Sequence, residues 1–240
     1  MLTLSACSGN LIGGVSAADE ADVVSGVGEE GSLDYVSQID KMKIMSVAIM
    51  ADPDTWQSML DNATAEEYIP ATITINNRRV ENAAIRPKGN SSLSSIARDS
   101  STDRYSFKVK FDEYVDGQTW LGLDKLVLNG NWSDASSMKE YLSYDILELA
   151  GVATPLFAYA SITVNGEPWG FYLLVEVLDK AYRVRTQNGI GEMYKPESME
   201  IGGNGAGNFG GDMSDGGGFT MPEGITAPEG FILPEDGTAP

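Results

Sequence analysis

The sequence predicts an α+β fold in which one principal helix packs on a mostly antiparallel sheet. The first of three observations is a hairpin: Asn165-Gly166 separates two apolar runs, Phe157–Val164 and 169–176. Asn-Gly tolerates positive φ at both central positions, which a tight hairpin turn requires. The second observation is a helical apolar period over 134–150, and the third is a strand-like alternation over 104–111.

The principal helix is expected to begin at Asp134, whose short acidic side chain can accept hydrogen bonds from free backbone N–H groups. Gly151 follows the last apolar residue and suits a left-handed cap. Large apolar residues recur at three- and four-residue spacing: Met138, Leu142, Ile146 and Leu149. We expect this stripe to be the buried face, so that Leu142→Ala would cost about 2–5 kcal/mol.

The segment 104–111 alternates cleanly between two kinds of residue. One face carries Tyr105, Phe107, Val109 and Phe111, and the other carries Arg104, Ser106, Lys108 and Lys110. Successive strand residues point to opposite faces, so the pattern predicts a half-buried strand with a basic outer face.

The remaining elements are weaker predictions. A buried strand is expected within 43–50, a helix from Asp52-Pro53, a hairpin of 71–75 and 78–88 turning at Asn76-Asn77, and a strand at 125–129. Loops are expected at 89–102 and 112–123, a helical turn at 179–185 and a last strand at 192–195.

Composition excludes several classes of function. The chain of 240 residues carries 16 Lys and Arg against 35 Asp and Glu, a net charge of −19, which argues against direct nucleic-acid binding. There is no His, and the only Cys is Cys7, so a His or Cys metal cluster and an intrachain disulfide are excluded. No run of 18 apolar residues suggests a membrane span.

Most of the net negative charge lies in two end segments that contain no Lys or Arg, 1–34 and 197–240. We therefore predict a partial lipoprotein signal at 1–7, a disordered acidic tether at 8–34, an incomplete folded domain at 35–200 and a disordered Gly/Pro/Glu-rich segment at 201–240.

The segment 4–7 (LSAC) is similar to a bacterial lipoprotein box, in which the cysteine is lipidated; a chance match is the alternative. No charged and apolar leader of full length precedes Cys7, so we expect the chain to begin inside its signal peptide. The expected location is the bacterial cell surface, exported or lipid-anchored, with membrane contact only through Cys7, and the spore coat is an alternative location.

Five phrases occur in a fixed order: RPKGNSS at 86–92, RYSFKVKF at 104–111, KLVLNGNWSDASSMKE at 125–140, NGEPWGFYLLVE at 165–176 and MYKP at 193–196. Together they resemble the spore-coat protein H kinase family (CotH kinases) over about residues 40–196. The resemblance implies a fold like a kinase small lobe. It also implies an atypical protein kinase that uses ATP and Mg²⁺ to phosphorylate Ser or Thr of a spore-coat or surface protein.

Some related proteins are surface or cell-wall proteins without demonstrated kinase activity, so a non-catalytic adhesion or structural protein is the alternative. In the family, the metal-binding and catalytic aspartates follow the Tyr-Lys phrase, where this chain has the segment 201–240 instead. The catalytic residues are therefore expected beyond Pro240. The chain as given is expected not to transfer phosphate, and whether it is an enzyme stays open.

The resemblance also implies the nucleotide-binding residues. The phosphate loop would be Lys88, Gly89, Asn90 and Ser91, unless these form an ordinary surface turn. A strand lysine, Lys108 or Lys110, would contact phosphate and pair with a helix glutamate, Glu140 or Glu148, unless this is a solvated basic face.

Glu176 would lie at the connection between kinase lobes, where backbone groups meet adenine, unless it is a surface glutamate. Asp134 is predicted to be a helix cap rather than a metal ligand. Trp169 and Tyr172 are predicted to be core residues rather than nucleotide platforms. A closed architecture that directs Lys108 and Lys110 away from any cleft would contradict the kinase interpretation.

Overall fold

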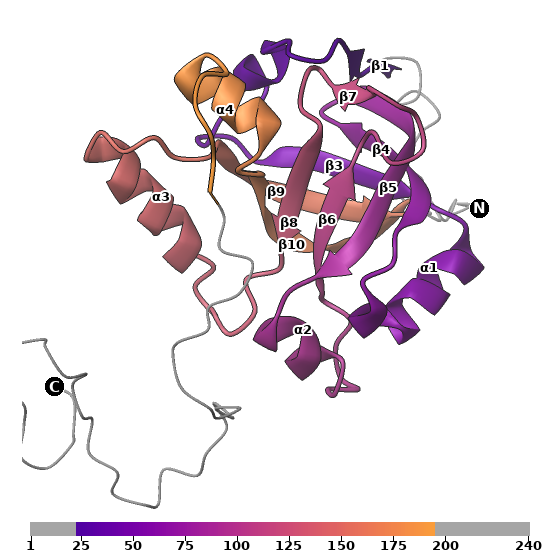
Figure 1. Ribbon diagram of the computed structural model, residues 1–240. Coiled ribbons are helices and arrows are strands. Elements are labelled where there is room, and N and C mark those ends of the chain that lie inside the picture. The colour runs from indigo at the N-terminus through magenta and orange to yellow at the C-terminus, as the bar shows by residue number, and fades with distance from the viewer. Residues whose placement is uncertain (1–22, 195–240) are drawn as a thin grey trace, which may run out of the picture. The chain divides into compact units, whose positions relative to one another are not determined.

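Seven strands form a closed sheet in the computed structural model, which describes residues 23–194 (Figure 1). The order is β5-β4-β3-β9-β10-β8-β6, and β6 pairs again with β5. The strands are β1 (Val24–Ser25), β2 (Val27–Gly28), β3 (Met45–Met50), β4 (Ile69–Ile75), β5 (Arg78–Lys88), β6 (Ser106–Lys110), β7 (Thr119–Trp120), β8 (Lys125–Asn129), β9 (Phe157–Val164) and β10 (Glu167–Glu176). The helices are α1 (Pro53–Asp61), α2 (Ser91–Ile96), α3 (Lys139–Leu149) and α4 (Lys180–Gln187), with short 3₁₀ turns η1 (Asp34–Ser37) and η2 (Ala63–Ala65).

Most neighbouring strands are antiparallel, and only β3–β9 and β1–β5 are parallel among the described pairs. This confirms the predicted α+β class and the mostly antiparallel sheet. The closed barrel is not a specific feature of a kinase small lobe, so that finer expectation is not confirmed by the topology.

Strand alternation places the core inside the barrel. The predicted apolar face of 104–111 is buried, with Phe107, Val109 and Phe111 fully enclosed. On α1, Trp56 contacts the Phe107 ring at 5.4 Å and the Trp169 ring at 5.5 Å between centroids. Tyr172 is also fully buried and Trp169 packs against the core, as predicted. Each fully buried large apolar side chain contributes roughly 1.5–3 kcal/mol.

Both hairpins are confirmed. β4 and β5 meet at Asn76-Asn77, and β9 and β10 meet at Asn165-Gly166, all four with positive φ. The start of α1 is also confirmed, because the Asp52 carboxylate accepts from the Thr55 backbone N–H at 2.8 Å.

Part of the predicted tether is ordered structure. Within 8–34, β1 pairs with β5, and β2 pairs with β7. The sequence-based boundary was placed too late because two-residue strands carry no periodic pattern. Two predicted loops also contain elements: 89–102 includes α2, and 112–123 includes β7.

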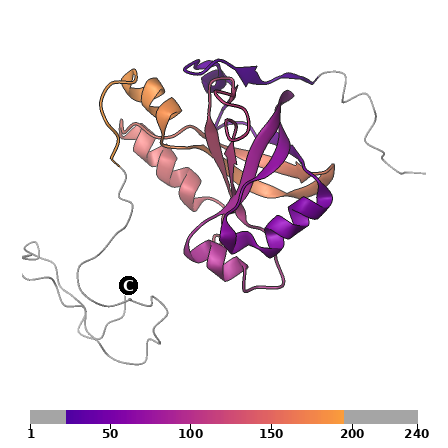
Figure 2. The ribbon, with the colours of Figure 1, turned by 45° about the vertical axis from the view of Figure 1, so that its right-hand side comes forward.

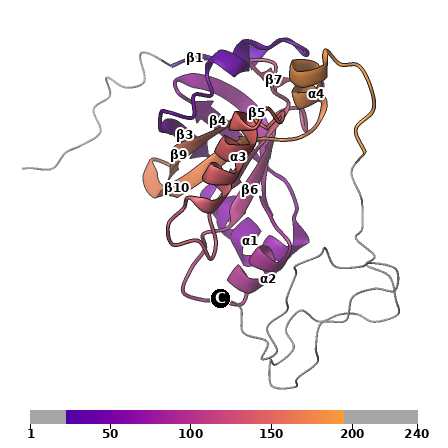
Figure 3. The same ribbon diagram turned by 90° about the vertical axis from the view of Figure 1, so that its left-hand side faces the viewer.

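The predicted helix 134–150 begins later than expected, and a different face of it is buried. α3 spans Lys139–Leu149, and Asp134 prepares its start by accepting from the Lys139 backbone N–H at 2.9 Å. The stripe predicted to be buried is exposed: Leu142 by 40%, Ile146 by 62% and Leu149 by 80%. Tyr141 and Tyr144 face the barrel instead, where they pack on Phe157, Leu173 and Val175. In Figure 3, α3 lies in front of the strands.

The other helices lie around the barrel in two groups. α1 and α2 lie at one end, whereas α3 and α4 lie along the side (Figure 2). The predicted helical turn at 179–185 is confirmed as α4. Residues 192–194 form no strand, which corrects the prediction for 192–195, and residue 195 lies outside the described range. Cys7 and the segment 201–240 also lie outside it.

Candidate functional site: a lysine at the edge of a polar groove

Basic side chains share the outer face of three adjacent strands. Strand register places Arg86 opposite Lys108, Lys88 opposite Ser106, and Lys110 opposite Lys125. Because Phe107, Val109, Leu126 and Leu128 alternate with them and are buried, these cations must point outward. The predicted basic face therefore extends over β5, β6 and β8.

Three of these cations pair directly with carboxylates. Arg86 pairs with Glu66, Lys110 with Glu113 at 2.7 Å, and Lys125 with Asp179 at 2.9 Å. Lys108 also has an interaction partner.

Lys88 differs, because a neutral amide stands between it and the nearest helix carboxylate. Its Nζ donates to Asn129 Oδ1 at 3.0 Å, and Asn129 Nδ2 donates to Glu140 Oε1 at 2.8 Å and Oε2 at 2.9 Å. Tyr144 also donates to Glu140 Oε1, at 3.1 Å. This chain of contacts joins the end of β5 to α3 through the end of β8.

Burial changes the pKa values of two residues in this hydrogen-bonded series, Lys88 and Tyr144. Desolvation lowers the pKa of Lys88, and Glu140 opposes that effect only in part. Burial, together with the charge of Glu140, raises the pKa of Tyr144 to about 12. Tyr144 is therefore a hydrogen-bond donor to Glu140 throughout the physiological pH range.

A groove of about 530 Å³ lies beside these hydrogen-bonded residues. Its lining residues are Lys88, Gly89, Asn90, Ser92, Ser106, Asn129, Asn131, Trp132, Ser133, Asp134, Lys139 and Glu140. At Gly89 the backbone has φ +146°, and a Cβ would stand 2.7 Å from Ser92 Oγ. Glycine is therefore required where the strand turns into α2.

The structure brings some of the predicted site residues together and separates others. Lys88, Gly89, Asn90 and Glu140 all line the groove, while Ser91 begins α2 and is exposed outside its lining. Lys108 and Lys110 share the outer face of the closed sheet but do not line this groove, so the condition set out above counts against a kinase interpretation that depends on these two lysines. Glu148 binds Lys41 at 2.8 Å instead of any of these strand lysines. No group of three or more acidic, His or Cys side chains suited to a metal occurs within 23–194.

Asn129 is the residue that sequence reasoning missed. A signal existed: it ends the strand 125–129 on the same alternating face as Lys125. The cross-strand proximity to Lys88 could not be read from one strand.

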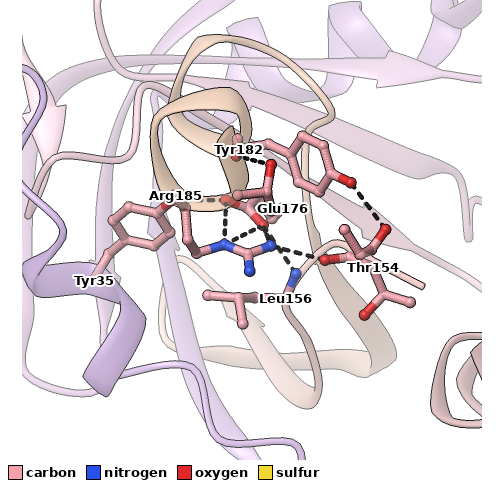
Figure 4. Close-up of polar contacts among 8 residues, drawn as sticks. Tyr35, Thr154, Leu156, Glu176, Tyr182 and Arg185 are labelled. Atoms are coloured by element: carbon pink, nitrogen blue, oxygen red, sulfur yellow. Dashed lines mark hydrogen bonds and ion pairs between the residues drawn. The ribbon is translucent and has the colours of Figure 1, made fainter. Parts of the chain in front are cut away.

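Glu176 lies in a separate buried network, shown in Figure 4. Its carboxylate accepts from Tyr35 Oη at 2.6 Å, from Arg185 Nη2 at 2.5 Å and from the Leu156 backbone N–H at 3.0 Å. The residue is only 1% exposed, so the alternative of a surface glutamate was wrong. Its own N–H donates to the Leu156 carbonyl, so that group is occupied within the sheet.

Burial, and next the hydrogen bond to Glu176, raise the pKa of the Tyr35 phenol. The network therefore holds a single negative charge against Arg185, and it links η1, the end of β10 and α4. These contacts of Glu176 join three elements of the structure to one another.

The comparison with protein families decides the assignment. The model for CotH kinase protein matches residues 85–216. The chain belongs to the CotH kinase protein family. Within residues 23–194 of this CotH family chain, no helix has both the length and the apolar character needed to cross a membrane.

Two curated relatives come from Bacillus subtilis (strain 168). Inner spore coat protein H-like protein is 38% identical over 74 residues, which are 31% of this chain and 22% of the relative. Inner spore coat protein H is 25% identical over 129 residues, which are 54% of this chain and 33% of the relative. The matched region of the CotH family chain therefore spans about a third or less of either relative.

Proposed function

We propose that this CotH family chain contributes the nucleotide-handling part of a protein kinase that transfers the ATP γ-phosphate to Ser or Thr of a spore-coat or surface protein. One observation carries the proposal: a strand lysine, Lys88, is followed by a glycine turn and connects through Asn129 to a helix glutamate, Glu140. Protein kinases use three comparable parts, a glycine-containing loop over the phosphates, a strand lysine and a helix glutamate, although in kinases the lysine and the glutamate pair directly.

The groove residues fit the phosphate groups of ATP. Lys88 and Lys139 supply positive charge, and the Gly89–Asn90 turn supplies backbone N–H groups. ATP would supply the phosphoryl group that is transferred, and Mg²⁺ would neutralise charge on it. The described residues would bind and orient the phosphates, and we assign no Mg²⁺ ligand among them.

The names of the relatives support a location in the spore coat, which we propose together with the lipid anchor or export suggested at Cys7. The acceptor would be another protein of the same surface. The alternative is a non-catalytic surface protein. An absence of nucleotide binding in the following experiment would favour this alternative.

Isothermal titration calorimetry with MgATP tests the proposal. Lys88→Met removes one charge-assisted hydrogen bond, worth about 1.5–3 kcal/mol, so the affinity should fall roughly 10- to 100-fold. Lys43→Met is the matched control, because Lys43 is exposed and its ion pair within residues 23–194 is with nearby Asp40. Equal affinity of Lys88→Met and wild type would contradict the proposal.

A further inference from the structure

Asn129 occupies a position that requires both a hydrogen-bond acceptor and a hydrogen-bond donor. Lys88 is purely a hydrogen-bond donor and ionised Glu140 is purely an acceptor, whereas a side-chain amide has both a donor and an acceptor. The oxygen of Asn129 therefore faces Lys88 and its nitrogen faces both oxygens of Glu140. A carboxylate at position 129 would repel Glu140 and pair directly with Lys88.

Resting on the proposed function, we propose that Asn129 is a positioning residue that keeps the Lys88 ammonium fixed at the groove but separated from any carboxylate, so that it can bind a phosphate anion. Its neighbours show the contrast: Arg86, Lys110 and Lys125 each contact a carboxylate directly. The carboxylate compensates part of the positive charge of each of these cations, which weakens their attraction for a further anion.

The geometry leaves Lys88 capacity for a ligand. An ammonium carries three donors, and the bond to Asn129 uses one of them. The residue lines the groove together with Gly89, Asn90 and Lys139. The lowered pKa of Lys88 agrees with an ammonium that is buried without a directly bonded carboxylate.

The decisive variant exchanges the amide of Asn129 and the carboxylate of Glu140. Asn129→Asp combined with Glu140→Gln keeps the net charge and still allows a hydrogen bond between positions 129 and 140, now donated by residue 140, but it moves the negative charge into direct contact with Lys88. The matched control is Asn82→Asp combined with Glu81→Gln, which moves a charge by one residue elsewhere on β5. Thermal melts of all three proteins establish that each is folded.

Two readouts are taken. The first is the affinity for MgATP and for inorganic tripolyphosphate, which should fall at least tenfold in the Asn129/Glu140 exchange and stay within twofold in the control. The second is competitive acetylation of Lys88 against Lys43 across pH, read by mass spectrometry. Lys88 should become reactive at a higher pH in the exchange variant, because the adjacent carboxylate favours the charged amine.

The outcomes separate the two proposals. An unchanged labelling profile of Lys88 overturns the role of Asn129, whatever the affinity. Unchanged affinity in a folded exchange variant overturns it as well. A shifted profile in a protein whose wild type binds neither probe supports the separation of Lys88 from carboxylates and contradicts the nucleotide-binding function.

Discussion

At the scale of single residues, Glu176 shows how much a buried charge depends on its partners. Its carboxylate is enclosed by Tyr35, Arg185 and the backbone of Leu156. A buried ion pair adds little over a well-packed apolar pair, but breaking one leaves an uncompensated charge. Glu176 is therefore a sensitive point for stability, independent of any ligand.

We expect Arg185→Met to lower the free energy of unfolding by about 3–5 kcal/mol, because it leaves Glu176 buried without its cation. Urea denaturation measures this. The double variant Arg185→Met/Glu176→Gln should recover part of the loss. Arg183→Met serves as the control, since its ion pair with Glu192 is long, at 3.8 Å, and largely exposed on the glutamate side. A loss under 1 kcal/mol in Arg185→Met would mean that Glu176 is not charged as described.

Asp52 provides a test of pH dependence. Hydrogen bonds from the Thr55 hydroxyl and backbone N–H lower its pKa from the ordinary value of 3.8. The folded state therefore favours the ionised form. The resulting stabilisation is present above the ordinary pKa and is lost as the pH falls through the lowered pKa of the folded state.

Asn can cap a helix without titrating, so Asp52→Asn should lose less stability than wild type between about pH 6 and about pH 2. Urea midpoints at the two pH values give the comparison. Parallel losses in the two proteins would show that the Asp52 cap does not contribute to acid sensitivity.

At the scale of elements, α3 is held by aromatic contacts rather than by its aliphatic stripe. Tyr141 stacks on Tyr159 at 4.8 Å, meets Phe157 edge-on at 5.1 Å and donates to the Lys41 carbonyl at 3.1 Å. Lys41 in turn binds Asp145 at 2.6 Å and Glu148 at 2.8 Å on α3. The position of Glu140, and with it the contact chain to Lys88, depends on this attachment.

Two alanine variants of α3 distinguish its faces. Tyr141→Ala should cost about 3 kcal/mol, because it removes a large ring from packed contacts. Leu142→Ala should cost less than about 1 kcal/mol, since the side chain is 40% exposed, which revises the larger sequence-based expectation. Chemical denaturation measures both. A larger loss for Leu142→Ala than for Tyr141→Ala would reverse the assignment of the buried face.

At the scale of the whole described unit, closure of the barrel removes the free edge that β6 would otherwise present. β6 pairs with β8 on one side and with β5 on the other. The same closure aligns Lys88, at the end of β5, with Asn129, at the end of β8, on one outer face. The candidate site is therefore a consequence of the sheet topology.

Hydrogen exchange measured by mass spectrometry tests this closure. In a closed sheet the amides of Phe107–Val109 should exchange about as slowly as those in the middle of β10, because both have neighbours on two sides. An open sheet ending at β6 would leave alternate amides of that strand unpaired. Fast exchange confined to β6 would contradict the closed architecture.

The sequence by itself determined the local elements. Asn76-Asn77 and Asn165-Gly166 set both hairpin turns, the alternation at 104–111 set a strand with one buried face, and Asp52-Pro53 set the start of α1. These signals are local, because each depends on the backbone preferences of a few adjacent residues. The ordered phrases also identified the family before any coordinates.

Only the tertiary structure decided which face of α3 is buried, where the sheet closes and which lysine reaches the helix glutamate. A periodic stripe shows that a helix has an apolar face, but the neighbouring surface selects the face that packs, and here a cluster around Phe157 accepts Tyr141 and Tyr144. Asn129 meets Lys88 because β6 lies between β5 and β8. Such cross-strand contacts join residues 41 positions apart, and no local pattern encodes them.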